Sequence, residues 1–172
     1  MILDKLSRLI AYNTSMKNYY KYIKNIGVIY GQNCDFSKKI SWGSEPYLIK
    51  IGNHTRITNG VTFVTHDGGV WILRELKNKP DLDLIGAINI GDNCHIGMNV
   101  TIMPGVNIGN NVIVGCGAVV THNIPDNEIW AGVPARKISD YEEYYNKHIN
   151  DFVYTKNMSV QEKRLYLIDK YK

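Results

Sequence analysis

Five histidines are the side chains with the clearest capacity for chemistry, and His66 stands out among them by its position. It ends residues 61–66 (VTFVTH), directly before Asp67 and a stretch of different character. An imidazole titrates near neutral pH, so it can take a proton from an alcohol as the oxygen attacks a carbonyl carbon. His66 is therefore a candidate general base, with a purely structural histidine as the alternative. His54 and His148 are interpreted as surface residues.

A six-residue repeat indicates the elements that must position this histidine. Branched apolar residues recur at every sixth place, and a smaller apolar residue follows each of the first five after four places. Neither a helix nor a plain strand has this period, whereas hexapeptide repeats are typical of a parallel β-helix. The branched residues are Ile90, Ile96, Ile102, Ile108, Val114 and Val120, and the smaller ones are Cys94, Val100, Val106, Val112 and Ala118.

The period also predicts how the coils stack. If six residues form one side and three sides form one coil, residue i lies beneath residue i+18. Ile90 is then expected beneath Ile108, and Ile96 beneath Val114. Branched side chains fill the interior, the backbone pairs as parallel strands, and Gly or Asn turns the corners because both tolerate positive φ.

The repeat extends towards the N-terminus and is then interrupted once. Residues 30–36 repeat the frame of residues 90–96, and residues 51–63 supply another coil. Residues 69–87 break the period, which predicts a loop that projects from the β-helix and carries binding groups. Trp71 and Arg74 are candidates to contact an acceptor; alternatively, Trp71 packs the loop onto the body.

Helical segments are predicted on both sides of the β-helix domain, which is placed at residues 26–136. Residues 1–25 form an amphipathic pattern that is expected to pack on the protein itself or on a neighbouring subunit, with an anionic membrane surface as the alternative. Residues 137–172 contain capping-box patterns at Ser139 and Ser159, which predict helices near 140–149 and 160–171 that cap the β-helix. The apolar side of the N-terminal segment comprises Ile2, Leu6, Leu9, Ile10, Tyr19, Tyr20, Tyr22 and Ile23.

These motifs resemble the hexapeptide-repeat acetyltransferases, in particular the branch that O-acetylates sugars and polysaccharides. The resemblance covers roughly residues 26–138. Its most specific parts are residues 61–68 (VTFVTHDG), 114–121 (VGCGAVVT), 124–127 (IPDN) and 131–136 (AGVPAR). It implies a mainly β fold built on a left-handed parallel β-helix, and a homotrimer with its sites between neighbouring chains. The left hand comes from the resemblance alone, because parallel crossovers are generally right-handed.

The resemblance also implies roles for individual residues. His66 is the base for direct transfer from acetyl-CoA to a sugar hydroxyl, and its imidazolium then protonates the leaving thiolate. A groove binds the donor, with Arg136 pairing with a phosphate. The residues expected to bind the cofactor are Met98, Cys116, Thr121, His122, Arg136 and Lys137. The residues expected near the acceptor are Asp67, Trp71, Arg74 and His95, the last being a surface residue in the alternative reading.

Composition limits the remaining functional classes. The net charge of +4 without a block of like charges disfavours nucleic acid as a partner. No apolar run has the length of a membrane span, and the start lacks a signal-peptide pattern. Cys34, Cys94 and Cys116 are an odd number without CxxC spacing, which favours free thiols in a reducing cytoplasm over a disulfide or a metal site.

Several alternatives stay open at this stage. An antibiotic, serine or an amino sugar would replace the sugar hydroxyl as acceptor without requiring a different base. A non-catalytic β-helix scaffold would not bind acetyl-CoA. A zinc hydratase on the same fold would need a matched set of three histidines, and the histidine spacing here does not provide one, so no metal is expected.

Overall fold

The computed structural model describes residues 15–172. By its internal contacts the chain divides into a first unit that ends at Tyr141 and a second unit over Glu142–Lys172. The part of the predicted N-terminal helix that falls on residues 1–14, including Ile2, Leu6, Leu9 and Ile10, lies outside the described residues.

Helix α2 (Met16–Asn25) is the first described element. It begins after Ser15, whose hydroxyl accepts a hydrogen bond from the Asn18 N–H at 3.4 Å and so caps the helix. Tyr19 and Ile23 on one side of α2 are buried in the main core, while Lys24 is exposed. The expectation that this helix packs on its own protein is therefore confirmed for the described part.

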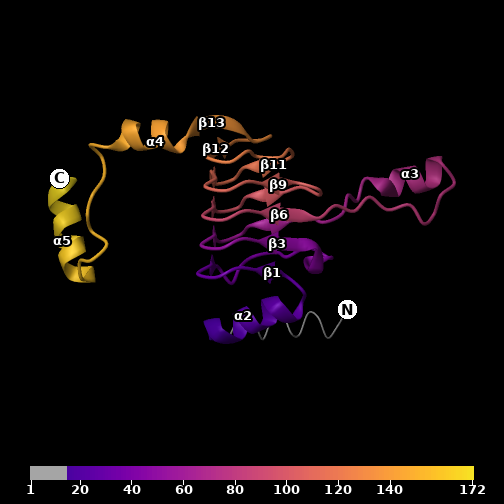
Figure 1. Ribbon diagram of the computed structural model, residues 1–172, viewed down its shortest axis with the longest axis horizontal. Helices are drawn as coiled ribbons and strands as arrows, with labels where there is room; N and C mark the ends of the chain where they lie inside the picture. Colours follow the sequence, from indigo (N-terminus) through magenta and orange to yellow (C-terminus); the bar gives the residue numbers. More distant parts are fainter. Residues whose placement is uncertain (1–14) are drawn as a thin grey trace. The chain divides into compact units, whose positions relative to one another are not determined.

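Short strands form three ladders, one for each side of the coil (Figure 1). The first face contains β1 (Ile29–Tyr30), β3 (Ile49–Ile51), β6 (Ile88–Ile90) and β9 (Asn107–Ile108). The second contains β2 (Asp35–Phe36), β4 (Arg56–Ile57), β7 (His95–Ile96), β10 (Ile113–Val114), β12 (Glu128–Ala131) and β13 (Arg136–Asp140). The third contains β5 (Thr62–Phe63), β8 (Thr101–Ile102) and β11 (Val119–Val120). Strands within a ladder pair in parallel, except β13, which is antiparallel to β12.

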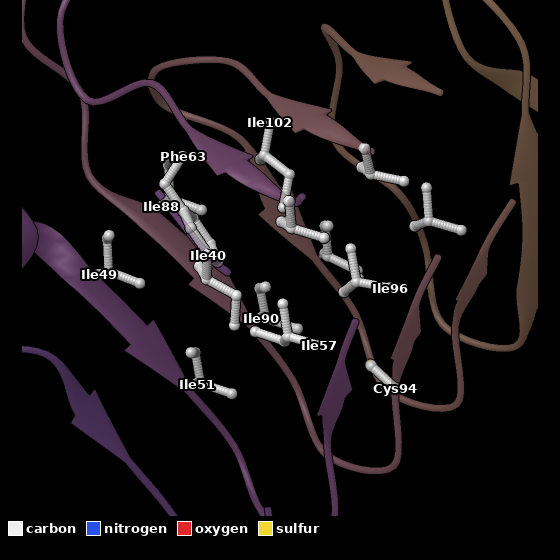
Figure 2. Close-up of a cluster of buried hydrophobic side chains, with 14 of the residues drawn as sticks. Ile40, Ile49, Ile51, Ile57, Phe63, Ile88, Ile90, Cys94, Ile96 and Ile102 are labelled. Atoms are coloured by element: carbon white, nitrogen blue, oxygen red, sulfur yellow. The ribbon is translucent and has the colours of Figure 1, made fainter. Parts of the chain in front are cut away.

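The stacking predicted from the period is confirmed. Ile90 pairs with Ile108 on the first face, and Ile96 pairs with Val114 on the second. Every branched residue of the repeat is buried, as is every member of the smaller row. Figure 2 shows these side chains stacked in the interior between the strands, with Ile57 close to Ile96. The core thus follows directly from the repeat.

Asparagines turn the corner between the first and second faces. Asn93, Asn111 and Asn127 have φ values of 56°, 56° and 67°, the left-handed conformation that asparagine tolerates. The Asn93 side-chain amide donates to Asn111 Oδ1 at 2.9 Å, and Asn111 donates to Asn127 Oδ1 at 2.9 Å. This side-chain ladder fixes the register of successive coils.

The interruption of the repeat forms a projecting arm (Figure 1). The arm leaves after Asp67, carries helix α3 (Val70–Leu76) and returns beside its starting point. The Asp67 N–H donates to Leu84 O at 2.8 Å, and the Gly86 N–H donates to Thr65 O at 2.9 Å. These two bonds hold both ends of the arm together.

The C-terminal residues differ in part from expectation. Strand β13 was not predicted, because an antiparallel strand leaves no trace in a six-residue period. Ser139 belongs to this strand, where it pairs with Ile129, so the capping box predicted there is wrong. Helix α4 (Tyr141–His148) lies near its predicted range. In the second unit, α5 (Val160–Lys170) begins with the predicted capping box between Ser159 and Glu162. A cap over the β-helix made by these helices stays a prediction.

Truncating one buried residue of the repeat is expected to cost much of the stability. Ile96 is fully buried, so Ile96→Ala should lower the free energy of unfolding by about 2–5 kcal/mol through lost burial and a residual cavity. Ile72→Ala is the matched control, because Ile72 lies on the arm and is 59% exposed. Denaturant unfolding at fixed protein concentration measures both variants. Equal losses would contradict a core built from the repeat.

Candidate active site

His66 lies at the corner between the third and first faces. It follows β5 and forms an isolated antiparallel bridge with Ile85, the residue at which the arm returns. The second coil is interrupted after His66, because the arm begins one residue later. The His66 side chain is 46% exposed. The side chain is thus outside the core, where a substrate can reach it.

A carboxylate that the sequence analysis did not identify fixes the imidazole. Glu45 Oε2 lies 3.2 Å from His66 Nδ1 and accepts a hydrogen bond from Thr65 Oγ1 at 2.5 Å. The Glu45 N–H donates to Thr65 Oγ1 at 3.2 Å, so the same threonine holds both ends of the glutamate. A proton on Nδ1 facing this carboxylate leaves Nε2 with its lone pair. In this tautomer Nε2 is the ring nitrogen that can accept a proton.

A pocket of about 340 Å³ connects His66 with the start of the arm. It includes three of the four residues predicted to lie near an acceptor, Asp67, Trp71 and Arg74. Trp71 is 72% exposed, so the alternative in which it packs the arm onto the body is wrong. Arg74 Nη2 pairs with Asp83 Oδ1 at 2.6 Å, and Arg74 Nε donates to Leu82 O at 2.8 Å. These contacts connect α3 to the returning segment of the arm.

The fourth residue, His95, lies elsewhere. It is on the outer side of the second face, in a separate pocket of about 700 Å³ that also contains Arg56. Burial lowers the pKa of His95, and the positive charge of Arg56 lowers it further. Both effects favour the neutral imidazole, and His95 lies in a different pocket from His66.

The expected cofactor residues occupy two corners. Met98 and Cys116 lie on adjacent coils at the corner between the second and third faces, where the Gly117 N–H donates to Met98 O at 2.7 Å. A Cβ on Gly97 would lie 2.7 Å from Cys116 N, so glycine permits the close approach of these two coils. This corner therefore combines closely packed glycine backbone with the exposed residues Met98 and Cys116, but it is not the corner of His66.

Thr121 and His122 share the corner of His66. They follow β11 as Val64 follows β5, two coils further along the third face. Thr121 Oγ1 and His122 Nδ1 are 2.8 Å apart. Within one chain, His66 therefore shares a corner with Thr121 and His122, which belong to the predicted cofactor site. Met98 and Cys116 lie at a different corner.

The two predicted cations stand at the end of the coil, on β13. Arg136 Nη1 donates to Ala135 O at 2.8 Å, and the residue is exposed. Lys137 Nζ pairs with Glu128 Oε1 at 3.1 Å. The Trp130 indole donates to Glu128 Oε2 at 2.7 Å, and this bond, followed by the contact with Lys137, lowers the pKa of Glu128.

Comparisons with known proteins agree with this architecture. The family model described as bacterial transferase hexapeptide (six repeats) matches residues 87–122. Protein CapG of Staphylococcus aureus is 51% identical over 152 residues, which are 87% of this chain and 87% of CapG. This chain belongs to the hexapeptide transferase family.

Further relatives place the chain among the acetyltransferases of this family. The galactoside O-acetyltransferase of Escherichia coli K12 is 34% identical over 130 residues, which cover 74% of this chain and 61% of that enzyme. A solved galactoside acetyltransferase in complex with coenzyme A has a TM-score of 0.64 and 26% identity, covering 92% of this chain and 86% of the other. A maltose O-acetyltransferase from Clostridium difficile 630 has a TM-score of 0.62 and 25% identity over 79% and 83% of the two chains. The predicted left-handed β-helix and the enzyme class are confirmed.

The cysteines of this hexapeptide transferase are free thiols. Cys94 is buried in the smaller apolar row, and burial raises the pKa of its thiol, which favours the neutral form. Cys34 is half-buried and Cys116 is exposed. Within residues 15–172, no three His, Cys, Asp or Glu side chains are grouped in a way that could hold a metal ion.

In the transferase, Glu45 is expected to act as a positioning residue for His66. Glu45→Ala removes the acceptor of both the His66 and Thr65 hydrogen bonds, so kcat should fall about tenfold or more while KM for the acceptor changes little. Glu45→Gln keeps one acceptor oxygen and should fall between Glu45→Ala and the parent. Steady-state kinetics and circular dichroism distinguish this from misfolding. A change confined to KM would contradict the assignment.

Proposed function

We propose that this transferase moves an acetyl group from acetyl-CoA to a hydroxyl of a sugar or polysaccharide. The observation that carries the proposal is the His66 imidazole, which is 46% exposed, contacts Glu45 through Nδ1 and lines a pocket together with residues of the arm. Two similar enzymes, the galactoside and maltose O-acetyltransferases, support a carbohydrate acceptor. The similarity to a coenzyme A complex supports the donor.

His66 and Glu45 supply the proton transfers that direct transfer requires. His66 Nε2 removes the proton from the acceptor hydroxyl as that oxygen forms its bond to the thioester carbonyl carbon. The C–S bond then breaks, and the protonated imidazole gives its proton to the departing thiolate. Glu45 stabilises the transient imidazolium through Nδ1. Acetyl-CoA supplies the activated acyl group, and no covalent enzyme intermediate is required.

The residues at the corner between the second and third faces are suited to bind acetyl-CoA. The backbone at Met98 and Cys116 offers peptide groups for the amides of an extended pantetheine arm, because the small residues there leave it accessible. The exposed guanidinium of Arg136 is suited to a phosphate. Lys137 adds positive charge beside it, balanced in part by Glu128.

The separation of the two corners leads us to propose a homotrimer with shared sites. His66 follows the third face, whereas Met98 and Cys116 precede it. A complete site then requires His66 of one chain beside the Met98–Cys116 corner of the next. Closed threefold symmetry would form three identical sites in this way.

We also place the reaction in the cytoplasm, where acetyl-CoA is made. Free thiols at Cys34, Cys94 and Cys116 are compatible with a reducing compartment. None of the helices that the structure describes combines the length and the apolar character needed to cross a membrane.

Incubation with acetyl-CoA and a panel of acceptors tests the proposal. The panel contains monosaccharides, oligosaccharides, nucleotide sugars, an amino sugar, serine and aminoglycosides, with release of free thiol as the readout and mass spectrometry of the product. We expect transfer to at least one carbohydrate hydroxyl. Transfer to serine or an antibiotic without any transfer to carbohydrate would overturn the proposed acceptor. Absence of transfer to every member would favour a non-catalytic scaffold.

A further inference from the structure

An aromatic pocket adjoins the pocket of His66 and is not used by the transfer reaction. Its volume is about 520 Å³, and Tyr22 and Ile26 of the N-terminal helical region form one side of it. The opposite side is formed by the first coil and the segment after it, namely Trp42, Gly43, Ser44, Pro46 and Tyr47. Ser44 lines both pockets, so the two hollows share a wall.

The shared wall belongs to the segment that positions the base. Glu45 points to His66, while Tyr47, two residues later, faces the aromatic pocket. Pro46 starts the short 3₁₀ helix η1 (Pro46–Leu48), and the Leu48 N–H donates to Glu45 O at 3.0 Å. The residue that holds the imidazole and the residue that lines the second pocket are thus placed by one turn of backbone.

Two of the three aromatic rings, those of Trp42 and Tyr22, are held by contacts with neighbouring aromatic side chains. Trp42 stacks on Phe63 with centroids 5.2 Å apart, and its indole N–H donates to Tyr19 OH at 3.3 Å. Tyr22 stacks on Tyr19 at 6.3 Å. Tyr47 packs against Gly27, where an added Cβ would lie 2.7 Å from Tyr47 Cβ. Trp42 itself is only 3% exposed and belongs to the core, whereas Tyr47 is 61% exposed, so the Tyr47 ring is the one most available to a ligand.

The chemistry of the two pockets differs. Among the described residues, those that line the aromatic pocket carry no charged side chain, whereas Glu45, Asp67, Arg74 and Asp83 line the pocket of His66. Rigid aromatic rings beside the hydroxyls of Ser44 and Tyr47 suit an uncharged ligand with one apolar face and hydroxyls at its rim. A neutral sugar ring has this chemistry, whereas the diphosphate of a nucleotide sugar would find no cation there.

We propose that this aromatic pocket, formed by Tyr22, Trp42 and Tyr47, binds the sugar next to the one that is acetylated. The proposal rests on the proposed function and narrows it, because it makes the preferred acceptor a neutral oligosaccharide or polysaccharide. The acetylated sugar lies at His66, and the oligosaccharide continues past Ser44 into the aromatic pocket. Ser44 lines both pockets, so the two positions adjoin, as adjacent sugars of one oligosaccharide require.

The test compares acceptors of increasing length that end in the same sugar. The parent enzyme should show a kcat/KM about tenfold or more higher for a di- or trisaccharide than for the monosaccharide, as expected when a second ring gains an apolar contact surface. Tyr47→Ala should reduce this ratio about tenfold, and Tyr47→Phe, which keeps the ring, should retain most of it. Tyr154→Ala in the second unit is the control, because Tyr154 is fully exposed and remote in sequence from both pockets; it should leave the ratio unchanged.

The possible outcomes distinguish failure of the aromatic subsite from failure of the proposed acetyltransferase function. Acetyl transfer to carbohydrate with no preference for length, or a Tyr47→Ala variant that loses activity equally on all lengths, would overturn the aromatic subsite and leave the acetyltransferase assignment standing. A preference for nucleotide sugars over neutral oligosaccharides would overturn it as well. Transfer to no carbohydrate at all would overturn both.

Discussion

His66→Ala is expected to lower turnover about 10²–10⁴-fold, the range by which a positioned general base accelerates a reaction. The variant loses the Nε2 atom that removes the hydroxyl proton, and no second base is held at the same place by Glu45. The fold should persist, because the imidazole is about half exposed and lies outside the buried repeat. Single-turnover and steady-state rates of thiol release, together with circular dichroism and the unfolding transition, measure both parts of this expectation.

Two further measurements make the result specific to His66. His148→Ala is the matched control, since His148 lies on α4 and pairs with Asp151 in the second unit. It should retain the rate of the parent enzyme. Binding of coenzyme A to His66→Ala should be close to that of the parent, because the imidazole acts on the acceptor. If His66→Ala turns over within a few-fold of the parent, another residue is the base and the proposed mechanism fails.

Much of the fold could be predicted because one physical constraint repeats. Each coil must bury a branched residue on every side, so Ile90, Ile96 and Ile102 and their successors reveal the faces and the stacking. Where the constraint lapses, prediction fails. Strand β13 pairs in the opposite direction with β12, and its exposed residues Arg136 and Lys137 show no period of six.

The site illustrates the same limit at the level of single residues. Glu45 contacts His66 across 21 residues, in a segment where Pro46 disturbs the repeat and stacking cannot be counted. No local motif connects the two residues. The separation of His66 from Met98, by contrast, follows from the repeat itself. His66 comes after Phe63 on the third face, and Met98 comes after Ile96 on the second face. The position of each residue within its coil thus assigns His66 and Met98 to different corners.

That separation leads to the second large effect, recovery of activity by mixing two inactive variants. His66→Ala removes the base, and Cys116→Trp fills the small-residue corner of the predicted pantetheine groove with an indole. Cys116 is exposed, so the larger side chain should be tolerated by the fold. Each variant alone is expected to be nearly inactive. Co-expressed in equal amounts and assembled at random into trimers, they should regain about a quarter of the parent activity, because in about a quarter of the shared sites an intact His66 meets an intact corner.

A second mixture distinguishes shared sites from sites within one chain. If the site is shared, parent chains mixed equally with the double variant His66→Ala/Cys116→Trp should also retain about a quarter of the activity. If each chain carried a whole site, this mixture would retain about half, and the two single variants would not complement each other at all. The geometry of the single chain favours the first result, because the third face of the coil lies between the base and the corner that would hold the thioester. A mixture of single variants that stays inactive, beside a half-active mixture with the double variant, would show that the chain acts alone.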